Sequence, residues 1–267
     1  MASVEDSAPT PGRRVLLAFA AIFVGIVVSS AIGATVVSAA GWEFDVPSGL
    51  GDDFGRIAGQ VAAEVPLDHN RVPLVARVLL TVPLWVCLLG VPWLVSRRQK
   101  LDLRRDFGWG SSRRDVGVGL VVGIATQALL LPLIYMPLLR FIDGDDLAVP
   151  ARNLVASADS SLGVLALVAL TVVGAPIAEE FLYRGLLHRG LAERLAHRGR
   201  IGRALAVLGS STVFAASHFQ FLQFPGLLAV GIVAAVAFQM TGRLGTAIWI
   251  HVGFNATSVV VLLRQIA

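Results

Sequence analysis

The stretch SLGVLALVALTVVGAPIAEEFLYRGLL, residues 161–187, is long and apolar enough to cross a lipid bilayer, yet it ends in ionisable side chains. A transmembrane helix needs about 20 apolar residues, and no charged residue precedes Glu179 in this stretch. A carboxylate inside the bilayer is costly unless it is paired, hydrated or neutralised. Glu179, Glu180 and Arg184 are therefore candidates for a functional site inside a membrane.

The chain as a whole has the composition of a multi-pass membrane protein. Of its 267 residues 55% are hydrophobic and only 15% are charged, with a mean hydropathy of +0.74, whereas soluble domains carry about 25% charged residues. We expect an all-α, polytopic transmembrane helix bundle that forms a single membrane domain over 15–267, after a cytoplasmic tail at 1–14. About seven spans are predicted, at 15–41, 72–96, 116–140, 161–187, 204–222, 225–241 and 244–264.

The charges alternate between the connecting segments. Basic residues gather before the first span, at 97–114 and at 188–203, while acidic residues gather at 42–71 and 141–160. Basic loops remain in the cytoplasm, which predicts a plasma-membrane protein with a cytoplasmic N-terminus and an external C-terminus. This rule also accounts for the net charge of +4, so no nucleic-acid partner is expected. The lone Cys87 excludes an intrachain disulfide and makes a cysteine-ligated metal site unlikely.

The two adjacent glutamates differ in their local surroundings. Glu180 and Arg184 are four residues apart, so they share one face of a helix in the favourable acid-before-base order and can pair. Glu179 lies about 100° around the helix from Glu180, and its own neighbour four residues on is Tyr183. The spacing therefore predicts one paired carboxylate and one free carboxylate.

Two later spans carry polar residues at helical spacing. FAASHF places Phe214 four residues before His218, and HVGFNA places His251 four residues before Asn255. With Glu179 they supply a base, metal ligands and a donor for an oxyanion. At 1.5 Å per residue, Glu179 and His251 lie at roughly 10–15 Å depth, and His218 nearer 20 Å, if the span boundaries hold.

The order E-E-x-x-x-R, F-x-x-x-H and H-x-x-x-N on separate spans resembles the CPBP family of intramembrane endopeptidases. This family includes the type II CAAX prenyl proteases and bacterial Abi and bacteriocin-processing proteins, and the resemblance covers roughly 175–256. It implies a catalytic core in the C-terminal four helices, about 161–264, after variable helices at 15–140. It also implies that four residues are catalytic: Glu179, His218, His251 and Asn255. It implies that three others support them: Glu180, Arg184 and Phe214.

The expected function is hydrolysis of a peptide or protein substrate in a membrane-embedded cavity that opens to the cytoplasm, with Glu179 activating water. In one version His218, His251 and Glu179 hold Zn²⁺ or another divalent metal. In the other there is no cofactor: Glu179 and His218 orient the water, while His251 and Asn255 hold the oxyanion. Two further classes stay open, a proton-coupled transporter that uses these groups as a relay and a catalytically silent immunity or scaffold protein.

Overall fold

The computed structural model describes residues 11–40, 74–98, 100–141 and 160–266, with single positions between 144 and 158. All regular elements in these ranges are helices. Five are long and apolar enough to cross a membrane: Arg14–Gly33, Arg113–Tyr135, Ser161–Arg194, Phe224–Thr241 and Leu244–Arg264. The expected all-helical membrane bundle is confirmed, while the count of seven spans remains a prediction. Most of the tail at 1–14 and of the acidic segments at 42–71 and 141–160 lies outside the described residues.

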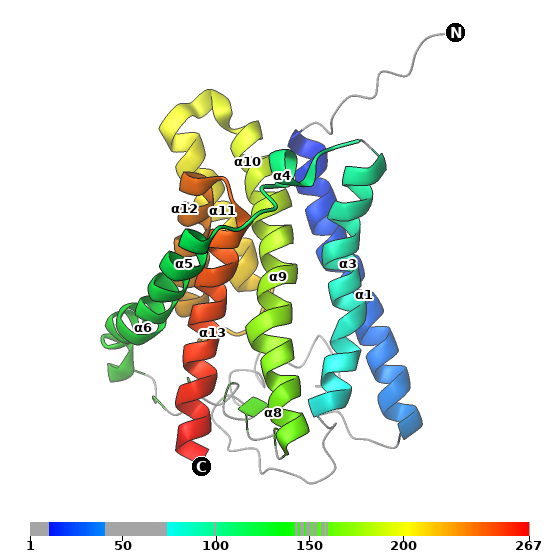
Figure 1. Ribbon diagram of the computed structural model, residues 1–267, viewed down its shortest axis with the longest axis vertical. Coiled ribbons are helices and arrows are strands. Elements are labelled where there is room, and N and C mark those ends of the chain that lie inside the picture. The colour runs from blue at the N-terminus through cyan, green and yellow to red at the C-terminus, as the bar shows by residue number, and fades with distance from the viewer. Residues whose placement is uncertain are drawn as a thin grey trace.

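A pair of long helices forms one side of the bundle. Helices α1 (Pro11–Ala40) and α3 (Leu74–Arg98) run side by side, and short α4 (Leu103–Phe107) follows them (Figure 1). Asp102 accepts from the backbone N–H of Arg105 and so caps α4. Phe107, fully buried, ties α4 to the core.

The centre of the bundle is one continuous rod. It runs through α8 (Ser161–Leu167), η3 (Val168–Gly174), α9 (Ala175–Glu180), η4 (Phe181–His188) and α10 (Arg189–Arg194). The two η segments are π-helical, a wider winding that often marks functional sites. Pro176 follows the first of them, where its missing N–H interrupts regular α-helical bonding. The two glutamates therefore sit on a short α-helical piece between two widened turns.

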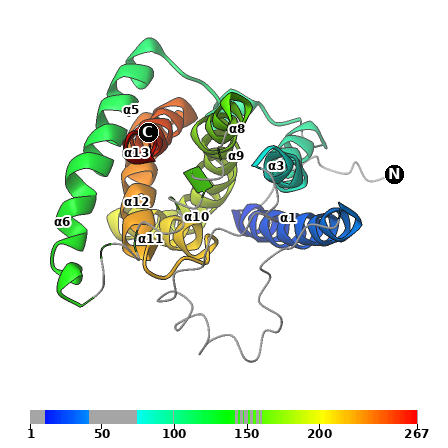
Figure 2. The same ribbon diagram turned by 90° about the horizontal axis from the view of Figure 1, so that it is seen from below.

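A second rod crosses the last helix closely. It consists of α5 (Arg113–Ala125), η1 (Thr126–Leu130) and α6 (Leu131–Tyr135), followed by the turn η2 (Leu138–Arg140). Figure 2 shows it beside α12 (Phe224–Thr241) and α13 (Leu244–Ile266), with α1 and α3 beyond α8 and α9. A Cβ on Gly123 would overlap the backbone of Ile250, so only glycine allows this approach.

The predicted span at 204–222 has the wrong boundaries. Helix α11 runs over Gly199–Ala216 after the turn η5 (Ala196–Arg198), and His218 lies in the turn that leads to α12. Figure 1 shows that α11 begins above the level of the start of α13, and that its turn to α12 stops short of the level reached by α8. The apparent excess depth of His218 therefore comes from the different levels at which these helices begin.

The described basic segments lie at one end of the bundle. Arg14 at the start of α1 forms a 2.9 Å ion pair with Glu193 in α10, and Arg189 donates to the backbone oxygen of Arg105. We call this the basic end; α13 finishes at the opposite end (Figure 1). This arrangement agrees with the predicted alternation of charges, while the side of the membrane that the basic end faces remains a prediction.

Candidate active site

The four predicted catalytic side chains meet in one cavity of about 750 Å³. Glu179 comes from α9, His218 from the turn after α11, and His251 and Asn255 from α13. They line the same cavity although 76 residues separate Glu179 from Asn255 in the sequence; their catalytic roles remain a prediction.

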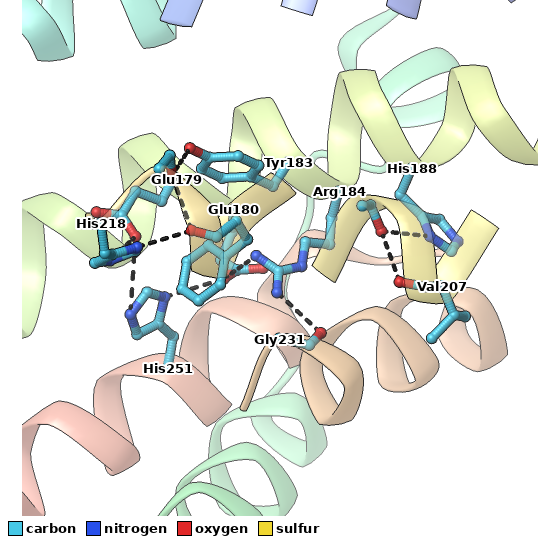
Figure 3. A network of polar contacts seen from close by, with 12 residues as sticks. Glu179, Glu180, Tyr183, Arg184, His188, Val207, His218, Gly231 and His251 are labelled. Atoms are coloured by element: carbon cyan, nitrogen blue, oxygen red, sulfur yellow. Dashed lines mark hydrogen bonds and ion pairs between the residues drawn. The ribbon is translucent and has the colours of Figure 1, made fainter. Parts of the chain in front are cut away.

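Glu179 presents an unpaired carboxylate oxygen to the two imidazoles (Figure 3). Its Oε2 lies 3.9 Å from Nε2 of His218 and 4.0 Å from Nε2 of His251, and it has no hydrogen-bond partner. The side chain is 19% exposed, so it reaches the cavity. These separations are too long for direct hydrogen bonds, and they suit atoms that are bridged by a third group.

The other nitrogen of each ring determines its tautomer. Nδ1 of His218 lies 2.8 Å from the carbonyl oxygen of Phe214, and Nδ1 of His251 lies 3.0 Å from Oε1 of Glu180. A carbonyl and a carboxylate only accept hydrogen bonds. Each Nδ1 therefore carries hydrogen, and in the neutral rings both Nε2 lone pairs face the same oxygen of Glu179.

The predicted ion pair of Glu180 with Arg184 is confirmed. Nη1 of Arg184 lies 2.8 Å from Oε1 of Glu180, and both side chains are almost fully buried. Arg184 also donates to the backbone oxygen of Gly231 and stacks over the ring of Phe214. The contact of Glu180 with His251 was not predicted, because these residues are 71 positions apart and no local pattern joins them. Glu180 therefore holds both the arginine and a histidine.

Phe214 is the apolar centre of the site. Its ring makes edge contacts with His218, His251 and Tyr183, at centroid distances of 4.8, 5.6 and 5.3 Å. The hydroxyl of Ser217 donates its hydrogen to the carbonyl of Phe214, so the phenol of Tyr183 is the donor in its contact with Oγ of Ser217. The sequence analysis assigned no role to Tyr183 or Ser217; the only signal was Tyr183 four residues after Glu179.

Asn255 lines the cavity but is anchored away from the carboxylates. Its Nδ2 donates to the backbone oxygen of Thr171 at 2.7 Å. An amide nitrogen carries two hydrogens, so one remains available toward the cavity. Asn255 is thus held in a fixed position with one donor to spare.

The side chains of Glu179, His218 and His251 are suitable ligands for a divalent metal, but their atoms lie farther apart than metal ligands do. Two imidazole lone pairs and a carboxylate oxygen are ordinary zinc ligands, and the unpaired Oε2 of Glu179 lies within 4.0 Å of Nε2 of both rings. Ligands about 2.0–2.2 Å from one tetrahedral ion lie roughly 3.3–3.5 Å apart, about half an ångström closer than here. Within the described residues, no group of three His, Cys, Asp or Glu side chains is already arranged as a metal site.

Comparison with known proteins gives one match. The family described as type II CAAX prenyl endopeptidase, Rce1-like, matches residues 161–257, a range that contains all three motifs. No curated protein and no solved structure matches the chain. The resemblance found from the motifs is confirmed over residues 161–257, where the chain is similar to the Rce1-like type II CAAX prenyl endopeptidases.

Proposed function

We propose that this protein hydrolyses peptide bonds inside its membrane cavity and that Glu179 activates the attacking water. The observation that carries the proposal is the unpaired Oε2 of Glu179, which lies in the cavity within 4.0 Å of two imidazole nitrogens. A buried acceptor without a donor is rare and calls for a bound partner. Water is the partner that peptide hydrolysis requires.

The spacing of Glu179 and His218 suits one bridging water. A water that donates one hydrogen to Oε2 of Glu179 and the other to Nε2 of His218 spans their 3.9 Å separation with two ordinary hydrogen bonds. Both of its hydrogens are then engaged, and its lone pair is free for a substrate carbonyl. The carbonyl of Phe214 keeps the ring of His218 in the tautomer that this bridge needs.

The proton follows a closed path. As the water oxygen attacks the carbonyl carbon, Glu179 takes the proton and the carbonyl π electrons move onto oxygen, which gives a tetrahedral oxyanion. Glu179 then returns that proton to the peptide nitrogen as the C–N bond breaks. The products are a new carboxyl group and a new amino group, and Glu179 is ready for another water.

His251 and Asn255 supply the electrophilic side of the site. His251 can donate to the oxyanion when its Nε2 carries a hydrogen, and Glu180 beside Nδ1 holds its ring in place. The spare amide hydrogen of Asn255 is a second donor.

A divalent metal would be held by the same residues. Glu179, His218 and His251 would be its ligands, and the ion would polarise the water or the substrate carbonyl. Glu180 would then keep Nδ1 of His251 in place and strengthen the ring as a ligand.

The test is hydrolysis of quenched fluorescent peptides by the purified full-length chain in detergent, with and without a chelator. We expect cleavage by the wild type and a fall of about 10²–10⁴-fold in Glu179→Gln. Glu193→Gln is the matched control, because it makes the same change on α10, where Glu193 pairs with Arg14 outside the cavity lining. Cleavage by Glu179→Gln at the wild-type rate would refute the role of Glu179, and no cleavage by either protein would refute hydrolysis and favour a silent scaffold or a transporter.

A further inference from the structure

The cavity extends from the site in one direction only. On α13 the lining begins at His251 and continues to Leu262, and on the central rod it runs from Leu167 to Glu179. Helix α13 runs away from the basic end and the central rod runs toward it (Figure 1). Both sets of lining residues therefore lie on the side of the site that is remote from the basic end.

The lining residues of α12, of the α5–α6 rod and of the segment after α11 lie on this same side of the site. The lining residues of α12 all fall within its first two turns, up to Val230, and α12 runs toward the basic end. The α5–α6 rod contributes only residues from Gln127 to Tyr135, and the α11 segment contributes only His218 and Gln220, beyond its helical part. These five elements place the cavity on the same side of the site, and its remaining lining residues, Leu147, Ala151, Leu154 and Val155, come from the segment at 141–160.

On the side of the site that faces the basic end, the side chains of the central rod are buried. Glu180, Arg184 and His188 follow one another along the central rod with 2% exposure or less. Phe238 of α12 and Leu244 of α13 are buried beside them. From Glu180 to Arg194 the rod is about 22 Å long at 1.5 Å per residue, and its first half is buried among these helices.

Specific contacts close the basic end further. Asp115 at the start of α5 pairs with Arg243 at 2.7 Å and accepts a hydrogen bond from Thr246, which joins α5 to the α12–α13 turn. Gly119 and Gly123 let α5 lie directly against α13. A second, apolar groove of about 530 Å³ beside α3 shares no lining residue with the cavity. Among the described residues, none of those that line the cavity comes from α4, α5 or α10.

We propose that the substrate reaches Glu179 from the face of the membrane opposite the basic segments 97–114 and 188–203. The inference rests on the proposed hydrolysis. Because basic segments remain in the cytoplasm, this places the substrate, an exported or membrane-inserted polypeptide, at the outer face, and it differs from the cytoplasmic opening expected from the sequence. A cytosolic prenylated C-terminus would meet the closed end.

The described lining also indicates which peptide segment fits. Its polar members beyond the site include Gln127, Gln220, Gln223, Thr257 and Ser258, which are neutral, and most other members are apolar. No Lys or Arg occurs among these lining residues, so they offer no cation to a free C-terminal carboxylate. The cavity therefore suits an uncharged, largely apolar interior segment, with side-chain amides and hydroxyls that can bond its backbone.

Cysteine labelling in sealed vesicles of both orientations tests the direction of access without requiring turnover. On a Cys87→Ser background, Ser258→Cys probes the cavity, Arg105→Cys marks the basic end and Phe141→Cys marks the opposite end. The reagent is the impermeant sulfonatoethyl methanethiosulfonate. We expect Ser258→Cys to react with reagent added on the side that labels Phe141→Cys. It should not react with reagent added on the side that labels Arg105→Cys.

Two results would overturn the inference: labelling of Ser258→Cys from the Arg105 side, or from neither side while both markers react. Since labelling does not depend on catalysis, an inactive protein with the expected labelling would count against the hydrolysis proposal alone. In vesicles of one orientation, the wild type should cleave a quenched apolar peptide added on the Phe141 side and leave the same peptide intact on the Arg105 side. Glu179→Gln is the blank on both sides.

Discussion

Replacing Glu180 with glutamine separates the structural role of one glutamate from the catalytic role that we propose for the other. Oε1 of Glu180 is contacted by Nη1 of Arg184 at 2.8 Å and by Nδ1 of His251 at 3.0 Å. The amide keeps an acceptor for these donors and removes the negative charge. Arg184 then stays buried at 1% exposure, with its ion partner gone and only the carbonyl of Gly231 and the face of Phe214 beside it.

The cost follows from that burial. Removing one partner of a buried ion pair costs about 3–5 kcal/mol, and a protein of this size loses about 2–4 °C of melting temperature per kcal/mol. We expect Glu180→Gln to melt about 10 °C below the wild type. Turnover should fall by about 10–100-fold, the usual effect of losing the partner that orients an active-site histidine. Glu179→Gln should keep its stability, because it neutralises an unpaired carboxylate.

The assay combines thermal unfolding in one detergent with peptide turnover for four proteins: wild type, Glu179→Gln, Glu180→Gln and Glu180→Gln with Arg184→Gln. The double variant should regain part of the lost stability, because it removes the stranded guanidinium. If Glu180→Gln were inactive but as stable as the wild type, while Glu179→Gln kept near-native turnover, the two roles would be reversed. Full stability of Glu180→Gln alone would refute the energetic argument.

Three further predictions concern helix packing, the buried contacts of Asp115 and metal binding. Gly123→Ala should lower stability by about 1–3 kcal/mol, because the added Cβ meets the backbone of Ile250; Gly117→Ala on the same helix has nothing within 4 Å and should be neutral in thermal unfolding. Asp115→Asn should cost about 1–3 kcal/mol, measured by denaturation, and an unchanged midpoint would contradict its role in joining α5 to the α12–α13 turn. Zn²⁺ or Co²⁺ should raise the melting temperature of the wild type but not of His218→Ala, and no shift in either protein would exclude these three side chains as a metal site.

Local patterns in the sequence carried much of the correct prediction. Helices and membrane spans follow from runs of apolar residues, because each backbone group in lipid must bond within its own segment. The pair of Glu180 with Arg184 follows from a spacing of four residues on one helix. The three motifs were sufficient to find the family resemblance at 161–257 and to name four residues that line the cavity.

Span boundaries were less predictable where the chain turns inside the bundle. The segment at 204–222 keeps apolar residues beyond the end of its helix: Phe219 and Phe221 lie in the turn after Ala216 and are 76% and 67% exposed. Hydropathy counts apolar side chains and does not distinguish a turn that exposes them from a helix. His218 therefore belongs to a turn although its sequence reads as part of a span.

By itself the sequence determined an all-helical membrane protein, its resemblance to a family over the C-terminal part, and the residues of its candidate site. Only the tertiary structure decided that Glu180 also holds His251, that two imidazole lone pairs face one oxygen of Glu179, and that the cavity leads away from the basic end. The physical reason is the separation along the chain of the residues that interact. Helix formation and i, i+4 pairing depend on neighbours within one turn, whereas these three features depend on how helices far apart in the chain pack together.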